Sequence, residues 1–344
     1  MKEDILKRRE MMFEEGLKYL KKKGKDQVTD ELIELYLKDY ERRKSTQING
    51  KDGLFYKMIE HARNRQRMSN TVDYKPRLKS DVNYDPNLDY EFCYLNETLF
   101  NFDPKKVLNE YRYYNSELQL FSNIKIGISE LSKENPNNQG LKDLKNSKSL
   151  NKENPNYWVS FSKSIISIAE FLSRFNNINE FNKFIKEFDI DDEKRIYLAL
   201  QLGNEIYGYG FALACDFLKE NCSQEYVKPD THIIKLFTNR DIVEKLDLKI
   251  SQETMDKAKE IEDSQTNPDK NNKKKSYSTK NLIEIFRAVK DYSESIDKLP
   301  YEVDKLFWLI GSGKLYRIPY IHETKDPIKT NIEDFIKKFS EKLT

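Results

Sequence analysis

A Gly-x-Gly turn is the first chemically suggestive feature of this chain. Gly208 and Gly210 end one helical pattern and open another, which predicts two helices joined by a tight hairpin. Glycine suits a backbone that turns through positive φ or approaches another group closely, and the helix that follows begins with unpaired N–H donors. Such a corner can bind a phosphate oxygen.

A polar box after the hairpin is the second feature. It reads Lys228-Pro229-Asp230-Thr231-His232 and precedes an apolar run. Asp230 and Thr231 stand where the N-cap of a helix is expected, and capping alone would explain an aspartate there. We interpret His232 as a capping or core histidine rather than a proton carrier.

Read together, the two features resemble the helix-hairpin-helix DNA glycosylases, the HhH-GPD superfamily. That family's pattern is a Gly-x-Gly hairpin, an alanine-rich second helix and then an aspartate in a Val-Asp-Thr-His-Ile-like box. The matching positions are Gly208, Gly210, Ala214, Asp230, Thr231, His232 and Ile233. The family's usual Leu-Pro before the first glycine is Ile206-Tyr207 here. The specific likeness covers residues 192 to 240, with looser support from 53 to 68 and from 299 to 313.

The resemblance implies an all-α, two-lobed fold. It also implies an enzyme that hydrolyses the N-glycosidic bond of a modified or mismatched base flipped out of double-stranded DNA. Breaking this bond develops positive charge on the sugar, so a carboxylate close to C1′ stabilises the transition state. Asp230 is the candidate for this catalytic carboxylate, with a second possible role in activating water. No metal and no cofactor is expected.

Position 212 sets the subtype that the resemblance implies. Members that also cut the strand place a nucleophilic lysine two residues after the second hairpin glycine, where this chain has Ala212. An alanine cannot form an imine. The expected enzyme is therefore monofunctional and leaves an abasic site, unless a lysine from elsewhere, such as Lys228, reaches the pocket.

DNA contacts are expected at the hairpin through backbone N–H groups, which bind phosphates without reading sequence. The residues concerned are Gly208, Gly210, Phe211 and Ala212. Asp216 and Trp158 are the candidates for a base pocket. Asp216 also shares a polar helical face with Lys219 and Glu220, a pattern that favours a solvent-exposed face instead.

A second DNA contact is expected at the end of an early helix, LFYKMIEHARNRQRM. Its basic end carries Arg63, Arg65 and Arg67, which are candidates to hold a phosphate backbone, although a solvated helix tip explains them equally well. Gln66 falls where the family wedges a polar residue into the duplex.

Composition restricts the class of protein more than its partners. The 344 residues carry 60 Lys and Arg against 58 Asp and Glu, so net charge gives no global nucleic-acid signal. The three cysteines, Cys93, Cys215 and Cys222, are too few for a four-cysteine iron–sulfur cluster and argue against a disulfide framework. No apolar run suits a membrane span or a secretory signal, so we expect a cytoplasmic protein, nucleoid-associated if prokaryotic. A monomer is expected.

Hydrophobic periodicity predicts helices throughout, with Thr29, Asp103 and Asp191 at helix starts and Gly311 or Gly313 at a helix end. Trp308 is expected in the core. The expected domains are an N-terminal helical extension (1–50), a glycosylase domain (51–320) and a C-terminal helix or tail (321–344). The hairpin is expected at 196–220. The polar insertion at 132–156 is interpreted as a surface loop or a partly disordered connection. The insertion at 263–281 is interpreted as a disordered surface loop, with DNA phosphates as the alternative partner of its lysine cluster.

Three functions therefore remain open. The first is a DNA glycosylase of base-excision repair, and the second is a DNA-binding protein that keeps the hairpin without activity. The third is an unrelated helical interaction protein in which Gly-x-Gly is only a turn. Duplex binding with a steep salt dependence would distinguish the first two from the third.

Overall fold

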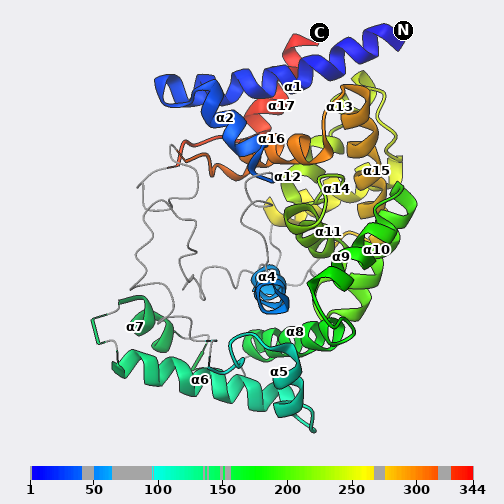
Figure 1. Ribbon diagram of the computed structural model, residues 1–344. Coiled ribbons are helices and arrows are strands. Elements are labelled where there is room, and N and C mark those ends of the chain that lie inside the picture. The colour runs from blue at the N-terminus through cyan, green and yellow to red at the C-terminus, as the bar shows by residue number, and fades with distance from the viewer. Residues whose placement is uncertain are drawn as a thin grey trace. The chain divides into compact units, whose positions relative to one another are not determined.

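The computed structural model shows an all-α protein (Figure 1). It describes residues 2–40, 50–63, 95, 97–134, 136–137, 139–147, 150–151, 156–266, 276–316 and 327–343. Within these ranges there is no strand, and the extended pairing is limited to an isolated bridge between Leu315 and Ile328. No helix in the same ranges has the length and apolarity that crossing a lipid bilayer requires.

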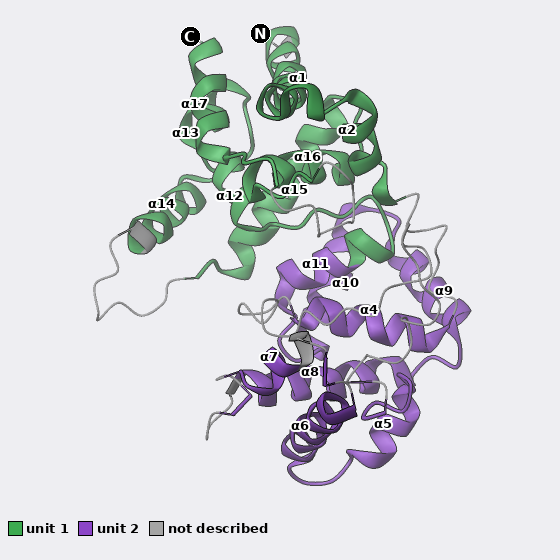
Figure 2. Ribbon diagram, turned by 90° about the vertical axis from the view of Figure 1, so that its left-hand side faces the viewer, with its two compact units in different colours: residues 1–45, 218–344 green, residues 46–217 purple. Residues whose placement is uncertain are grey.

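The chain forms two compact units (Figure 2). Unit 1 combines Met1–Ser45 with Leu218–Thr344, and unit 2 is Thr46–Phe217. The boundary falls inside one helix, α11 (Gly210–Asn221), so its first residues belong to unit 2 and its last to unit 1. Unit 1 thus contains most of the expected N-terminal extension, the expected C-terminal tail and the later part of the expected 51–320 domain.

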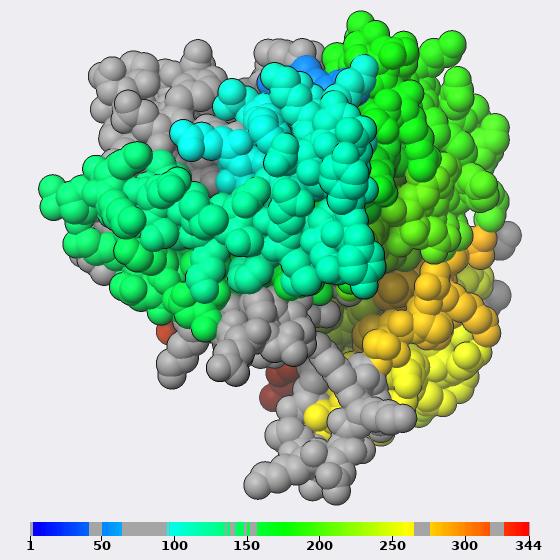
Figure 3. Space-filling model, turned by 90° about the horizontal axis from the view of Figure 1, so that it is seen from below, coloured from blue at the N-terminus to red at the C-terminus, as the bar shows by residue number. Residues whose placement is uncertain are grey.

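Unit 2 is built around α8. Its helices are α4 (Lys51–Arg63), α5 (Pro104–Glu110), α6 (Ser116–Glu134), α7 (Gln139–Lys145), α8 (Asn156–Ser173), α9 (Ile178–Phe188), α10 (Asp192–Glu205) and the start of α11. α8 packs against α4, α5 and α6 and buries Ile165 and Ile168 completely. Figure 3 shows α5 and α6 from outside, as one continuous cyan-to-teal surface.

Unit 1 is built around α16. Its helices are α1 (Lys2–Gly24), the short 3-10 helix η1 (Lys25–Gln27), α2 (Asp30–Leu37), α12 (Thr231–Phe237), α13 (Arg240–Lys245), α14 (Gln252–Thr266), α15 (Thr279–Ser295), α16 (Pro300–Ser312) and α17 (Ile332–Lys342). α16 contacts α1, α2, α12, α15 and α17. Val303, Leu306 and Phe307 are fully buried, which explains why this apolar helix is central.

The helix ends predicted from capping residues are confirmed. The side chain of Thr29 accepts from Leu32 N at 3.2 Å, Asp103 Oδ1 accepts from Lys105 N at 3.0 Å, and Asp191 Oδ1 accepts from Lys194 N at 2.8 Å. Each bond satisfies an otherwise unpaired donor of a first helical turn. Gly313, with φ of 63°, ends α16 in the left-handed conformation expected of a C-terminal glycine.

Two expectations about polar stretches need correction. Residues 132–156 are not all loop, because α6 continues to Glu134 and α7 occupies Gln139–Lys145. Likewise α14 continues to Thr266 and α15 starts at Thr279, so both ends of the 263–281 stretch are helical.

The expected core position of Trp308 also needs correction. Trp308 is half-buried rather than in the core, and Lys305 Nζ lies 5.4 Å from the centroid of its ring.

Candidate active site

The predicted hairpin forms in unit 2. α10 ends at Glu205, α11 starts at Gly210, and the N–H of Tyr209 donates to the carbonyl of Ile206 at 3.1 Å within the turn. Gly208 and Gly210 have φ of 84° and 64°. Both values lie in the left-handed region, where a side chain is strained, so the turn requires glycine at these two positions.

Neighbouring helices fix this turn in place. Ser164 of α8 donates its hydroxyl to the carbonyl of Tyr207 at 2.7 Å, and the N–H of Tyr207 donates to Ser167 Oγ at 2.9 Å. The hydroxyl of Tyr209 donates to the carbonyl of Met58 in α4 at 2.7 Å. The hairpin is therefore held by two serine side chains of α8 and by its own tyrosine, which bonds to the backbone of α4.

The turn also presents an open corner. A Cβ built on Gly210 would have no atom within 4 Å, so the space beside the first turn of α11 is free among the described residues. The Tyr207 side chain is 42% exposed, and Lys163 Nζ lies 5.7 Å from the centroid of its ring. A corner of this kind suits an anion, because the backbone N–H groups of a first helical turn carry partial positive charge.

The other hairpin candidates differ in exposure. Phe211 is buried, so it can offer a ligand only its backbone, whereas Ala212 is half-exposed. A polar contact through either residue therefore has to be made by the main chain. This agrees with the sequence-independent phosphate contact expected of both positions.

Asp230 lies in unit 1 as the N-cap of α12, as predicted. Its Oδ1 accepts from His232 N at 2.9 Å and from Ile233 N at 3.1 Å. The residue is half-buried, and its other oxygen, Oδ2, makes no hydrogen bond within the described part of the chain. Helix capping therefore uses only Oδ1, and Oδ2 is available to bind another group while the cap stays intact.

A buried ion pair lies behind Asp230. Lys219 Nζ and Asp304 Oδ1 are 2.6 Å apart, and Asp304 Oδ2 accepts from Lys228 N at 2.7 Å. Burial raises the pKa of Asp304 to about 6; the charge and hydrogen bond of Lys219 oppose this rise, and the negative charge of Asp230 adds to it. Asp304 was not identified from the sequence, although a charge inside the apolar run of α16 is a signal that could have found it.

The expected exposure of the polar face of α11 also needs correction. Asp216 and Lys219 were expected to be solvent-exposed together with Glu220, but they are 6% and 3% exposed. Lys219 Nζ also lies 3.4 Å from Glu220 Oε1, and Lys305 Nζ of α16 lies 4.0 Å from the same oxygen. Periodicity identified the face, but partners from other helices decide its burial.

Asp216 belongs to a separate polar pair inside unit 2. Its Oδ2 lies 3.3 Å from His61 Nδ1, and the His61 ring packs edge-on against Phe217, with centroids 5.6 Å apart. His61 was not identified from the sequence. Trp158, the other base-pocket candidate, is fully buried between Phe121 and Phe161, so it offers no ring face to a ligand in this conformation.

The basic end of α4 is only partly described. Arg63 Nη2 lies 3.8 Å from Glu60 Oε1, and the Arg63 side chain is 12% exposed, so this guanidinium is largely covered. Arg65, Gln66 and Arg67 lie outside the described residues. The phosphate and wedge contacts expected of these three residues remain predictions.

His232 is held against α16. A Cβ on Gly311 would come within 2.5 Å of the His232 Cβ, so the two helices meet here without space for a methyl group. Burial lowers the pKa of His232, and nearby Asp230 opposes that shift. The half-buried imidazole is therefore mainly neutral at pH 7.

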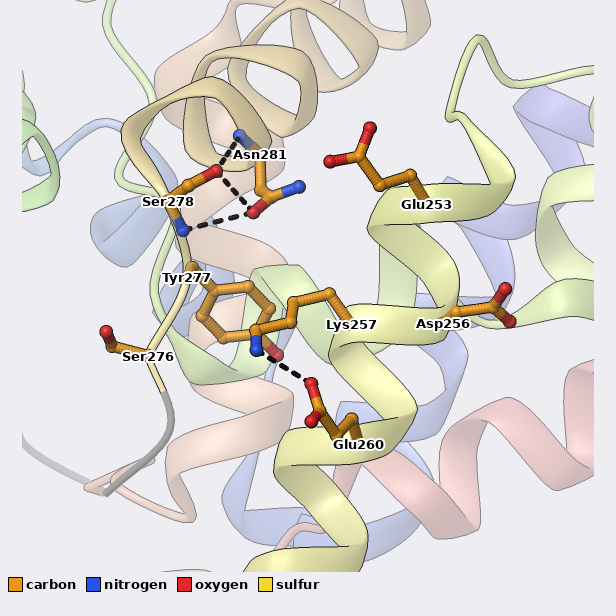
Figure 4. Close-up of a pocket in the computed structure, with 8 residues that line it drawn as sticks. All are labelled: Glu253, Asp256, Lys257, Glu260, Ser276, Tyr277, Ser278 and Asn281. Atoms are coloured by element: carbon orange, nitrogen blue, oxygen red, sulfur yellow. Dashed lines mark hydrogen bonds and ion pairs between the residues drawn. The ribbon is translucent and has the colours of Figure 1, made fainter. Parts of the chain in front are cut away.

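A groove in unit 1 lies apart from all of these residues in sequence and is shown in Figure 4. It runs between α14 and the start of α15 and is lined by Glu253, Asp256, Lys257, Glu260, Ser276, Tyr277, Ser278 and Asn281. Its polar groups are engaged with one another: Lys257 Nζ contacts Glu260 Oε2 at 2.7 Å, and Ser278 and Asn281 form the capping box of α15. None of the sequence-predicted site residues lines it.

Comparisons with known proteins found no family model, no curated protein and no solved structure that matches the chain. Within the described residues, no group of three or more His, Cys, Asp and Glu side chains is arranged to hold a metal ion.

Proposed function

We propose that this protein is a monofunctional DNA glycosylase that hydrolyses the N-glycosidic bond of a modified base flipped out of duplex DNA. The observation that carries the proposal is the state of Asp230, a half-buried carboxylate with one oxygen fixed by two backbone N–H groups and the other without a hydrogen bond to any residue that the structure describes. A fixed carboxylate can stabilise the positive charge that develops on the sugar, because no reorganisation is needed during the reaction.

The hairpin supports DNA as the substrate. Gly208 and Gly210 build a turn that α8 and α4 hold in place, and the start of α11 is open beside it. In this proposal the backbone N–H groups from Gly210 to Ala212 bind a phosphate and hold the strand while the base is extruded. The contact is to the backbone of the DNA, so it fixes position rather than sequence.

The absence of a lysine at position 212 supports the monofunctional subtype. Ala212 cannot form an imine with the sugar, and Lys219 is buried in its pair with Asp304. The product is then an intact strand with an abasic site. Sodium borohydride should trap no covalent enzyme–DNA adduct at any substrate base.

The decisive experiment is base release from duplex oligonucleotides that each carry one oxidised, deaminated, alkylated or mismatched base. Asp230→Asn should lower the single-turnover rate by about 10² to 10³ fold, equivalent to roughly 3 to 4 kcal/mol, while affinity for the duplex is retained. Asparagine caps a helix as well as aspartate does, so the variant loses charge and keeps the fold. Asp103→Asn changes the N-cap of α5 in the same way and serves as the matched control, with an unchanged rate expected.

A non-catalytic DNA-binding protein is the second candidate. It is favoured by the same cap bonds, because they give Asp230 a structural role that needs no chemistry. Duplex binding without release of any base in the panel would select this candidate. Absence of duplex binding would contradict both.

A further inference from the structure

The segment that leads to Asp230, residues 224–228, is attached to α16 at both of its ends. The N–H of Tyr301, which lies in the first turn of α16, donates to the carbonyl of Gln224 at 3.0 Å. One turn later, Asp304 Oδ2 accepts the N–H of Lys228 at 2.7 Å. Segment 224–228 is therefore attached to α16 at both ends.

The second of these attachments lies only two residues before Asp230. Pro229 restricts the backbone between them, and the N–H of Asp230 donates to the carbonyl of Lys228 at 2.7 Å. Few free torsions remain between the backbone nitrogen that Asp304 holds and the candidate catalytic carboxylate. A displacement of Lys228 would consequently displace Asp230.

The anchoring carboxylate has its own support. Asp304 is 1% exposed and Lys219 is 3% exposed, and they lie on different helices. A buried ion pair seldom adds net stability, because a well-packed pair of apolar side chains often stabilises the fold equally well. A role in positioning the backbone explains the pair of Asp304 and Lys219 better. The carboxylate divides its oxygens between the ammonium of Lys219 and the N–H of Lys228.

We propose that Asp304 is a positioning residue that fixes the backbone of residues 228–230 and so keeps Asp230 Oδ2 aimed at its target, with Lys219 neutralising the buried charge. The positioning part stands on the geometry of unit 1 alone. Its effect on reaction rate rests on the proposed function.

A pH dependence follows from the groups around Asp304. Lys219 of α11 and the N–H of Lys228 face its two oxygens, Asp230 adds negative charge nearby, and Lys305 is its neighbour in α16. Because burial raises the pKa of Asp304 to about 6, the carboxylate is protonated over a pH range where an ordinary aspartate stays charged. A neutral carboxyl accepts a weaker hydrogen bond from Lys228, so the anchor loosens as the pH falls through 6.

Two double variants test the anchor by removing the charges of Asp304 and Lys219 together. Glu220, which loses Lys219 in both variants alike, keeps Lys305 Nζ at 4.0 Å. Asp304→Asn with Lys219→Met removes both charges but keeps an amide oxygen that can accept from Lys228, whereas Asp304→Leu with Lys219→Met removes that acceptor. Amide hydrogen exchange over residues 226–233 should be at least about tenfold faster in the leucine variant than in the asparagine variant. With a substrate that the unmodified protein cleaves, the single-turnover rate should fall by a similar factor, with duplex affinity unchanged.

The unmodified protein supplies a measurement that needs no variant. The protection factor of the Lys228 amide, corrected for intrinsic exchange, should fall severalfold as the pH drops through 6, and this dependence should disappear in the asparagine variant. Protection that is independent of pH, or equal exchange in the two double variants, overturns the proposal. If exchange responds as expected but no base is released by the unmodified protein, the positioning role holds and the glycosylase function fails.

Discussion

At the residue scale, Asp230 and Gly210 each perform two tasks. Asp230 caps α12 with Oδ1 and leaves Oδ2 without a partner in the described chain. Gly210 supplies a left-handed turn, with φ of 64°, and leaves empty space where a side chain would be. In both residues a structural need is met by part of the residue, and the remaining part is available for a ligand.

Gly210→Ala separates the two tasks of this glycine. The left-handed backbone should cost about 1 to 2 kcal/mol of unfolding free energy, because alanine is strained there. The new methyl group would also occupy the space that a phosphate needs, so we expect duplex affinity to fall about tenfold, which equals about 1.4 kcal/mol of binding free energy. Thermal unfolding and fluorescence anisotropy with a labelled duplex measure the two effects.

Gly313→Ala is the matched control, because Gly313 has nearly the same φ, 63°, at the C-terminus of α16. It should cost a similar amount of stability, and duplex affinity should change less than about twofold. Equal losses of affinity in both variants would mean that Gly210 acts on binding through stability only, and the phosphate-binding role would be wrong.

At the element scale, the sequence was informative about where helices begin and end. Capping residues such as Thr29, Asp103 and Asp191 act within three residues of themselves, so one sequence contains the whole interaction. The burial of Lys219 was not predictable in this way, because its partner Asp304 is 85 residues away. The hairpin and the Asp230 cap are local in sequence and were predicted. The role of Asp304 depends on residues far away in sequence, and it was not predicted.

The contact between α1 and α17 shows how one side chain can join two elements. Asp334 of α17 accepts from the Tyr19 hydroxyl at 2.8 Å, and its Oδ2 lies 3.0 Å from Lys23 Nζ and 2.8 Å from Lys338 Nζ. The hydrogen bonds from Lys338 and Lys23 hold the pKa of Asp334 well below its usual range, although burial opposes them. Asp334 is therefore more favourable as an anion in the folded state than in the unfolded state.

Asp334→Asn tests this contact through pH. A lowered folded-state pKa adds stability at pH values above the unfolded pKa, near 4, and this stability is lost as the pH falls through the folded pKa. We expect the variant to lose about 1 kcal/mol of unfolding free energy at pH 7, a figure reduced for solvent screening, and the difference from the unmodified protein to shrink below pH 4. Urea titrations from pH 3 to pH 7 measure it.

Asp4→Asn is the control for this prediction, because Asp4 forms an exposed pair with Arg8 within α1. Its effect should be about 0.5 kcal/mol or less at pH 7. If Asp334→Asn loses the same stability at every pH, the contact acts through packing or neutral hydrogen bonds, and the electrostatic account of the α1–α17 contact is wrong.

At the scale of the whole molecule, charge balance limits how the protein can attract DNA. The 60 basic and 58 acidic residues nearly cancel, and several basic side chains are already paired, such as Lys18 with Glu15 and Arg240 with Asp256. A long-range positive field is therefore weak, and affinity has to come from local contacts. The hairpin contact that we propose uses neutral N–H groups, which would displace few counterions from DNA.

The predicted consequence is a salt dependence of duplex binding that is shallower than the steep one expected from the sequence. A few lysine or arginine contacts to phosphate should give a slope of log affinity against log salt of about −2 to −4. Gly210→Ala should lower the affinity at every salt concentration without changing this slope, because it removes a contact made by uncharged groups. Lys163→Ala, which removes the ammonium beside Tyr207 together with its 3.5 Å ion pair to Glu117 Oε1, should instead make the slope shallower by about 1. A slope of about −8 or steeper, unaffected by either variant, would mean that a broad basic surface binds the DNA and that the hairpin is only a turn.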